Sequence, residues 1–209
     1  MSHVPDSAAG LVDAEHSPSF QTVAVRRAVR DDAALLHRVA AETFPLACPT
    51  GTLPESIIAF VAENLSERSF EGYLADPARE LFIAEVDGDA AGYSMVVHGE
   101  PTDADVVASI TLRPTAELSK LYVREAHHGG GIAAALVEAV VLAAVARGAR
   151  SVWLGVNDEN VRANRFYEKS GFEKVGTKFF RLGERLESDF VRERRLDDGN
   201  RVVIPGSSR

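Results

Sequence analysis

Three glycines stand directly before an apolar, alanine-rich segment in the stretch HHGGGIAAALV. The start of a helix exposes unpaired main-chain N–H groups and carries the positive end of the helix dipole. Glycines let the chain approach a phosphate there without an intervening side chain. We therefore expect this segment to bind an anion through its main chain, with a plain glycine turn as the alternative. Its residues are Gly129, Gly130, Gly131, Ile132 and Ala133.

A dinucleotide-binding loop is one design that such glycines fit. Gly129, Gly131 and Ala134 match the spacing G-x-G-x-x-A, and Asp158 follows the next expected strand. In that fold the glycines follow the first strand directly. Here REAHH separates the glycines from the end of the preceding strand at Val123, and three expected strands come earlier in the chain. We therefore expect a different anion-binding loop.

Two motifs together indicate such a loop. The segment HGGGIA has the spacing of a motif in which Arg or Gln is followed by two residues, a Gly, one residue and a Gly or Ala, with His128 in the Arg or Gln place. After one further helix and strand comes NVRANRFYEKSGF, whose matching positions are Asn160, Ala163, Tyr167, Gly171 and Phe172. In this order and spacing, the chain resembles the GNAT acetyltransferases over residues 22 to 196, most strongly from 117 to 172.

The resemblance implies a use for each of these residues. Acetyl-CoA would be the co-substrate, with its pyrophosphate on the N–H groups of residues 129–133 and its pantetheine arm along the strand of Leu121, Tyr122 and Val123. Tyr167 would protonate the leaving thiolate, and Asn160 would bond the coenzyme or cap its helix. The remaining expected coenzyme contacts are His128 and Asn157. The His128 departure puts a charged contact from that side chain in question, but not the main-chain contacts.

The attacking amine needs a base, because an alkylammonium with a pKa near 10.4 is mostly protonated at neutral pH. Glu117 begins the segment ELSKLYV and is our candidate, with a water wire or a solvated glutamate as the alternatives. Strand alternation predicts that Glu117 shares a face with Ser119 and Leu121. We expect no metal ion: His127 and His128 are adjacent and diverge, and no third ligand stands at a zinc-like spacing.

The elements that must position these residues follow from the hydrophobic pattern. Strands are expected at 22–29, 81–86, 91–97, 117–123, 150–157, 172–182 and 188–196. Helices are expected at 30–44, 54–66, 66–76, 131–148 and 159–170. The segment from 100 to 116 is harder to assign and is expected to include a long loop. This order predicts an α/β domain with a mixed, mostly antiparallel central sheet of six to seven strands flanked by helices, in which only the strands around helix 131–148 are parallel.

Composition limits the class of protein. The 209 residues have a net charge of −8, which argues against general nucleic-acid binding, and the apolar runs are too short to predict a membrane span. The single cysteine, Cys48, fits a cytoplasmic location. We expect a disordered N-terminal tail at 1–20, one domain at 21–197 and a C-terminal tail at 198–209. A homodimer is left open, because the sequence shows no diagnostic patch.

The expected activity is acetyl-CoA-dependent N-acetylation of a primary amine by direct attack in a ternary complex. A polyamine or another small cationic amine is the favoured acceptor, because AETFPLACPTGTLPESIIAFVAENLS and the C-terminal strands resemble the polyamine acetyltransferase branch. The alternatives are a protein N-terminus or lysine as the acceptor, or a non-catalytic acyl-CoA sensor. The sequence does not reveal the acceptor itself.

Overall fold

The computed structural model describes residues 23–49, 51–182 and 185–196, so the two expected tails lie outside the described residues. The strands are β1 (Val23–Arg27), β2 (Arg79–Val86), β3 (Asp89–His98), β4 (Thr115–Val123), β5 (Ser151–Asn157), β6 (Glu173–Leu182) and β7 (Arg185–Arg195). The α-helices are α1 (Ala33–Thr43), α2 (Pro54–Asn64), α3 (Glu67–Ala75), α4 (Ala104–Ser109), α5 (Ile132–Ala146) and α6 (Val161–Lys169). A short 3-10 helix, η2 (Phe44–Ala47), follows α1.

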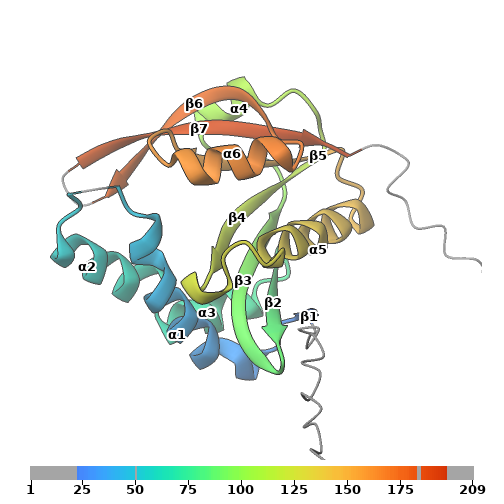
Figure 1. Cartoon of the computed structure of the whole chain (residues 1–209). Coiled ribbons are helices and arrows are strands. Elements are labelled where there is room, and N and C mark those ends of the chain that lie inside the picture. The colour runs from blue at the N-terminus through green and yellow to red at the C-terminus, as the bar shows by residue number, and fades with distance from the viewer. Residues whose placement is uncertain (1–22, 50, 183–184, 197–209) are drawn as a thin grey trace, which may run out of the picture.

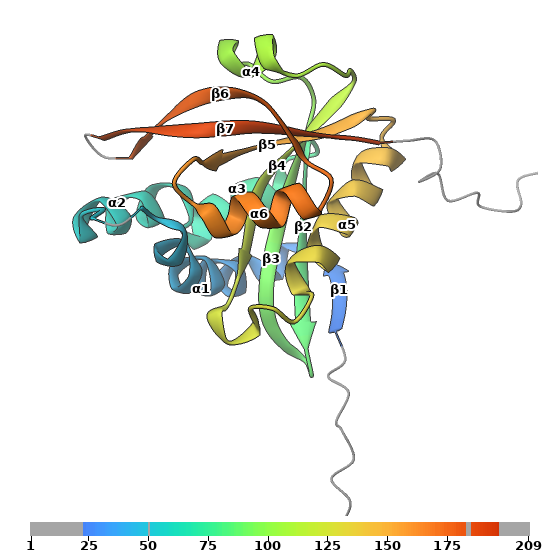
Figure 2. The ribbon, with the colours of Figure 1, turned by 45° about the horizontal axis from the view of Figure 1, so that its top comes forward.

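The strands form one seven-stranded sheet in the order β1-β2-β3-β4-β5-β7-β6. β4 and β5 are parallel, and the other neighbours are antiparallel. This confirms the predicted mixed, mostly antiparallel α/β fold. Figure 1 and Figure 2 show that β4 and β5 lie together at one end and then diverge, so the sheet has two arms.

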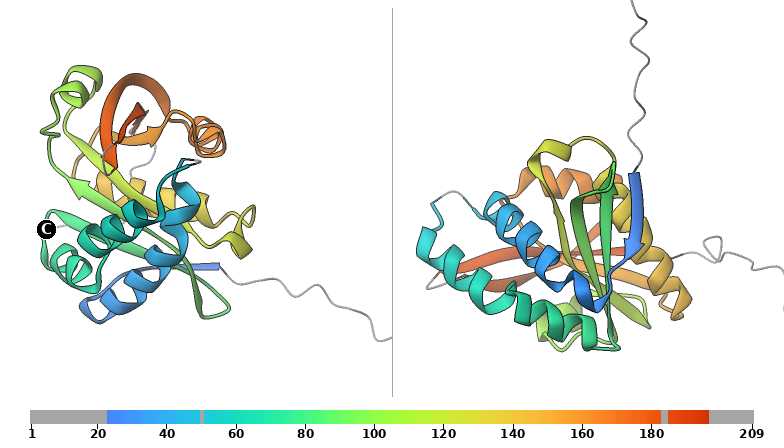
Figure 3. Two further views of the ribbon diagram at one scale, coloured as in Figure 1. Left: turned by 90° about the vertical axis from the view of Figure 1, so that its left-hand side faces the viewer. Right: turned by 90° about the horizontal axis from the view of Figure 1, so that it is seen from below.

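Helices cover both faces of the sheet, and Figure 3 shows this arrangement from two sides. On one face, α1 and α3 bury Leu36 and Phe70 against Tyr93 and Met95 of β3. On the other face, α5 and α6 enclose a core that includes Val140 and the aromatic rings of α6. Within the described residues, no helix is both long and apolar enough to cross a lipid bilayer.

The hairpin of β2 and β3 was predicted from its turn sequence, and the structure confirms it. Asp87 and Gly88 both have positive φ, 52° and 91°, which an Asp-Gly pair adopts readily in a tight hairpin turn. Gly92 then lets β3 approach β4 closely. A Cβ at this position would lie 2.6 Å from the main-chain oxygen of Tyr122.

The helix α4 lies in the segment 100–116, which was expected to include a long loop and where no helix was predicted. The side chain of Asp103 caps this helix by accepting from the N–H groups of Asp105 and Val106. Val106 is buried and packs with Trp153 and Val191, on the arm formed by β5, β7 and β6. The helix is only 6 residues long, and tertiary packing rather than local propensity accounts for it.

Candidate active site

The divergence of β4 from β5 leaves one edge of β4 open. β5 pairs only with Thr115, Ala116 and Glu117 of β4, whereas β3 pairs along the strand as far as Val123. From residue 118 onward, β4 therefore has no strand partner on its β5 side among the described residues. An open strand edge presents main-chain donors and acceptors that can pair with an extended ligand.

Leu121 and Val123 present their main-chain groups to this open edge. The N–H of Arg124 donates to the carbonyl of Ala91 at 2.8 Å, which makes that pair the hydrogen-bonded kind. Antiparallel ladders alternate, so the N–H and C=O groups of Leu121 and Val123 point away from β3. This is the strand segment that was predicted to carry the coenzyme arm.

A β-bulge in β4 alters the predicted side-chain pattern. Met95 pairs with Lys120, and Val96 pairs with Leu118, so Ser119 is the extra residue. The bulge shifts the alternation: Glu117 shares a face with Lys120 and Tyr122, while Leu121 packs on the α5 side. The prediction that Glu117 shares a face with Leu121 was therefore wrong, because plain alternation takes no account of an inserted residue.

The glycine segment forms the start of α5, as predicted. Gly131 is the N-cap residue with φ of 80°, and Gly129 has φ of 84°. A Cβ on either glycine would meet no atom within 4 Å, so the space beside the loop is open. Glycine is needed here because the backbone is left-handed. This conformation turns the free N–H groups at the start of the helix toward the open space.

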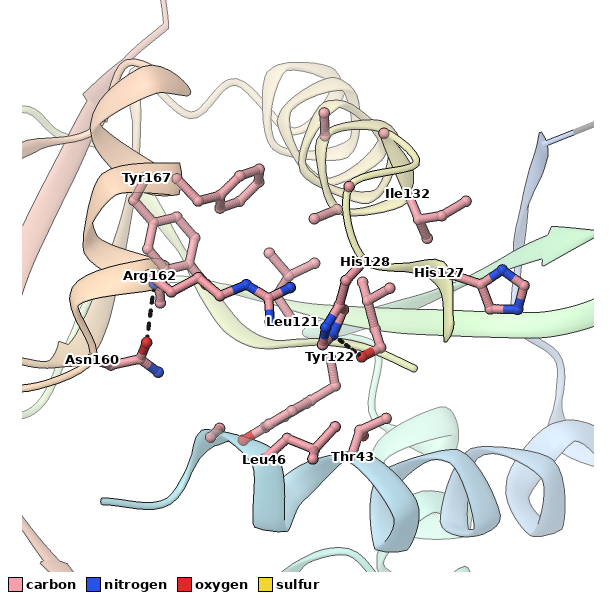
Figure 4. Close-up of a pocket in the computed structure, with 18 residues that line it drawn as sticks. Thr43, Leu46, Leu121, Tyr122, His127, His128, Ile132, Asn160, Arg162 and Tyr167 are labelled. Atoms are coloured by element: carbon pink, nitrogen blue, oxygen red, sulfur yellow. Dashed lines mark hydrogen bonds between the residues drawn. The ribbon is translucent and has the colours of Figure 1, made fainter. Parts of the chain in front are cut away.

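These elements enclose a cavity of about 430 Å³, shown in Figure 4. Its lining residues come from α1 and η2, β4, the glycine loop, the start of α5, and α6. The predicted coenzyme residues that line it are Leu121, Tyr122, Val123, His128, Gly129, Gly131, Ile132, Ala133, Asn160 and Tyr167. Gly130 is outside this lining, and its N–H donates to the carbonyl of His127 at 3.3 Å.

The side chain of His128, which stands in the Arg or Gln place of the motif, contacts the main chain of β4. Its Nε2 lies 2.9 Å from the carbonyl oxygen of Val123, so it donates to the open edge of β4. The side chain therefore ties the loop to the strand. In Figure 4 the guanidinium of Arg162 extends from α6 toward His128, whereas the ring of His127 points away. Arg162 thus brings a positive charge to the cavity from a different element.

The asparagines at the start of α6 have separate roles. The side chain of Asn160 caps α6 by accepting from the N–H of Ala163 at 3.0 Å, and it also lines the cavity. Asn157 lies outside this first cavity: its Nδ2 is 3.5 Å from Glu187, and its Oδ1 accepts from the N–H of Glu159. Asn164 is buried and holds the main chain at residues 157 and 160.

Tyr167 lies at the junction of the first cavity with a second one. Its ring packs edge-on against Phe166 and Phe172, which fixes its direction. Within the described part of the chain, its hydroxyl has no hydrogen-bond partner. Burial raises the pKa of Tyr167 above its usual value, so the phenol stays protonated at neutral pH. A protonated hydroxyl that is free to donate suits a general acid.

The second cavity, of about 320 Å³, adjoins the first and contains charged side chains of both signs. It shares Leu121, Tyr122, Asn160 and Tyr167 with the first cavity. Glu117, the predicted base, lines it, as does Asn157. The other ionisable side chains around it are Cys48, Lys120, Lys178, Glu187 and Asp189. No group of three His, Cys, Asp or Glu side chains in residues 23–49, 51–182 and 185–196 is arranged to hold a metal ion.

Burial dominates the electrostatics of this second cavity. It raises the pKa of Glu117, although Lys178, Lys120, Ser119 and Arg79 act in the opposite direction. It lowers the pKa of Lys120 to about 8, with Glu117 opposing and Arg79 adding to the effect. A carboxylate with a raised pKa is a stronger base, so Glu117 is better matched to an amine proton than an exposed glutamate is.

Comparison with known proteins decides the family. The model of the acetyltransferase (GNAT) family matches residues 39–172. A protein of Mycobacterium tuberculosis strain H37Rv, named as an uncharacterized N-acetyltransferase, is 48% identical over 165 residues, which are 79% of this chain and 98% of that protein. This chain belongs to the GNAT family. It is an N-acetyltransferase, as the sequence motifs predicted.

Solved structures of GNAT proteins share the fold. The PaiA N-acetyltransferase of Thermoplasma acidophilum, in complex with coenzyme A, is 20% identical and covers 84% of this chain and 99% of its own, with a TM-score of 0.68. The structure of yncA from Salmonella typhimurium with acetyl-CoA is 18% identical, covers 84% of this chain and 95% of its own, and has a TM-score of 0.55. Because both identities are below 25%, these two similarities show only that the proteins share a fold with this GNAT protein.

Several residues of the GNAT cavities were not predicted as site residues. They are Thr43 and Arg162 in the first cavity and Lys120, Lys178, Glu187 and Asp189 in the second. One signal was available in the sequence. Glu187, Asp189, Val191 and Glu193 alternate along β7, and all four are buried. Acidic residues at every second position of a strand, in phase with a valine, indicate carboxylates on a covered face.

Proposed function

We propose that the chain transfers the acetyl group of acetyl-CoA to a primary amine by direct attack in a ternary complex. One observation carries the proposal: Tyr167 lies at the junction of the two cavities. The first cavity is bordered by the open edge of β4 and the glycine-capped start of α5, and the second contains the carboxylate of Glu117. The first cavity suits the coenzyme, and the second suits the acceptor.

The residues present fit the coenzyme. The start of α5 at Gly131, Ile132 and Ala133, with the helix dipole, borders an open space that suits a pyrophosphate, whereas the Gly130 N–H is already bonded to His127. The guanidinium of Arg162 adds a permanent positive charge to the first cavity. The pantetheine amides would pair with the main-chain groups of β4 that point away from β3. One of these groups, the carbonyl of Val123, already accepts a hydrogen bond from His128.

The chemistry then needs two proton transfers. The amine nitrogen attacks the thioester carbon, and the C–S bond breaks as the new C–N bond is completed. Glu117 accepts the proton that the amine loses, and the hydroxyl of Tyr167 donates a proton to the departing sulfur. An N–H group of β4 at Leu121 or Val123 is placed to stabilise the oxyanion. Tyr167 and Glu117 return to their starting states by proton exchange with water.

The carboxylates favour an acceptor that carries an ammonium group before it reacts. Glu117, Glu187 and Asp189 all line the second cavity, and they support a basic amine over a neutral alcohol. A polyamine-like cation belongs to this class, and membership of the polyamine branch remains a prediction from the sequence. A protein N-terminus or lysine would need the same ammonium contact.

The test is to replace Tyr167 with Phe, which removes one oxygen and keeps the ring. We expect kcat to fall roughly 100- to 10,000-fold while the Kd for acetyl-CoA stays within about twofold, because the hydroxyl acts on the leaving group. Tyr73→Phe is the matched control, since its hydroxyl bonds the carbonyl of Asn64 away from both cavities. An unchanged kcat in Tyr167→Phe would remove this tyrosine from the mechanism. Acetyl-CoA binding without thiol release for any amine would instead favour the acyl-CoA sensor.

A further inference from the structure

The second cavity contains two lysines among its carboxylates, and this arrangement bears on the identity of the acceptor. The inference rests on the proposed acetyl transfer, which makes this cavity the acceptor site. Lys178 belongs to β6, and Lys120 belongs to β4. The two therefore approach the same cavity from different arms of the sheet.

Lys178 is held in a defined place beside Asp189. The two residues are cross-strand partners in β6 and β7, and Asp189 in turn pairs with Asn157 of β5, so their side chains leave the same face. Gly155 of β5 leaves room for them. A Cβ at position 155 would lie 2.5 Å from Cε and 3.2 Å from Nζ of Lys178, and 3.2 Å from Oδ2 of Asp189. The lysine stem therefore crosses the bare backbone of β5.

Both lysines lie near carboxylates: both act on the charge of Glu117, and Lys178 also acts on Asp189. Within the described residues, neither ammonium makes a salt bridge. Lys120 lies with its Nζ 5.4 Å from the centre of the Tyr73 ring. The two ammonium groups can therefore both contact a ligand. A second ammonium on the acceptor would be repelled by them, whereas an anionic group would be attracted.

We propose that the acceptor is a small amino acid, whose amine lies among Glu117, Glu187 and Asp189 and whose carboxylate binds the ammonium of Lys178. The cavity of about 320 Å³ has the size for such a molecule. The carboxylates select the amine end of the acceptor, and Lys178 selects its acid end. A polyamine would satisfy only the first requirement.

Matched pairs of acceptors that differ by one carboxylate test this proposal. We would measure coenzyme A release by chromatography for 4-aminobutyrate against butylamine and for ornithine against putrescine, with spermidine as the polyamine. For the native protein we expect kcat/KM to be roughly 10- to 100-fold higher for the carboxylate member of each pair, as charge-assisted hydrogen bonds warrant.

The variant Lys178→Met keeps the apolar stem and removes the charge. We expect it to abolish the preference within each pair while the KM for acetyl-CoA is unchanged, because Lys178 does not line the first cavity. Lys178→Arg should retain the preference in part. Lys169→Met, at an exposed position on α6, is the control and should behave as the native protein does.

The outcomes separate this proposal from the proposed function. Thiol release that is equal within pairs, or highest with spermidine or putrescine, would overturn the amino-acid assignment and leave the acetyltransferase function intact. The native ratio decides this even if Lys178→Met fails to fold. Absence of release with every acceptor, despite binding of acetyl-CoA, would overturn both.

Discussion

The carboxyl group of Asp189 is expected to make the stability of the protein depend on pH in an unusual direction. The residue is 8% exposed. Burial raises the pKa of Asp189 to about 6 from an ordinary 3.8; Lys178 opposes the rise, and Asp158 and Glu187 add to it. Because the folded state holds this proton more tightly than the unfolded state, the stabilisation is complete below the unfolded pKa. It is lost as pH rises through the folded pKa.

The magnitude follows from the two pKa values. A difference of about two pKa units corresponds to about 3 kcal/mol, at 1.36 kcal/mol per unit. Asp189→Asn cannot ionise and so avoids this cost. Its free energy of unfolding, minus that of the native protein, should therefore increase by about 2.5 kcal/mol between pH 4 and pH 8, because pH 4 is still slightly above the unfolded pKa. Effects of the substitution that do not depend on pH cancel in this difference.

Urea unfolding at several pH values measures the effect, with the slope m checked for constancy. Asp105→Asn serves as the control for the loss of an exposed carboxylate in α4. A difference between Asp189→Asn and the native protein that stays flat across this range would refute the reasoning. So would a difference that grows toward low pH, because that sign belongs to a carboxylate stabilised in its charged form.

Two further predictions concern the glycine loop and the base. Gly131→Ala forces a left-handed backbone at φ of 80° on a residue with a Cβ, at a cost of about 1–2 kcal/mol. Gly131→Ala should raise the Kd for acetyl-CoA, which calorimetry measures. The control is Gly148→Ala, with φ of 78° at the far end of α5, which should lower stability without changing this Kd. Equal Kd values in the two variants would contradict a role of the loop in binding. Glu117→Gln should lower kcat roughly 100-fold or more at pH 7, and the loss should shrink toward pH 10 as the amine loses its proton unaided. A pH–rate profile measures this, and a loss that is constant with pH would exclude Glu117 as the base.

Local sequence signals were sufficient for most of the fold. The Asp87-Gly88 turn fixed the β2–β3 hairpin, because both residues adopt positive φ at small cost. The glycines before α5 and the Asn160 cap of α6 marked two helix starts that each depend on residues a few positions apart. The missing prediction was α4, which is short and depends on the distant Trp153 and Val191 for its packing.

The candidate site shows the same difference between features predicted from local sequence and features that depend on long-range pairing. The site residues Leu121 to Val123, His128 to Ala133, Asn160 and Tyr167 were predicted from two short motifs and from the family resemblance that these motifs carry. Lys178 and Asp189 were not predicted, because they reach the cavity only through the pairing of β6 with β7 and of β7 with β5. Such long-range register has no signal in a short stretch of sequence.

The sequence by itself determined the family motifs, the order of the strands and helices apart from α4, and the glycine-rich start of α5. Each of these depends on the conformational preferences of neighbouring residues. The tertiary structure alone decided how β4 leaves β5, where the Ser119 bulge turns Glu117, and which charges surround the second cavity. These features arise when strands far apart in the chain pair and pack. No local preference encodes them, because the free energy that selects them comes from contacts between distant segments.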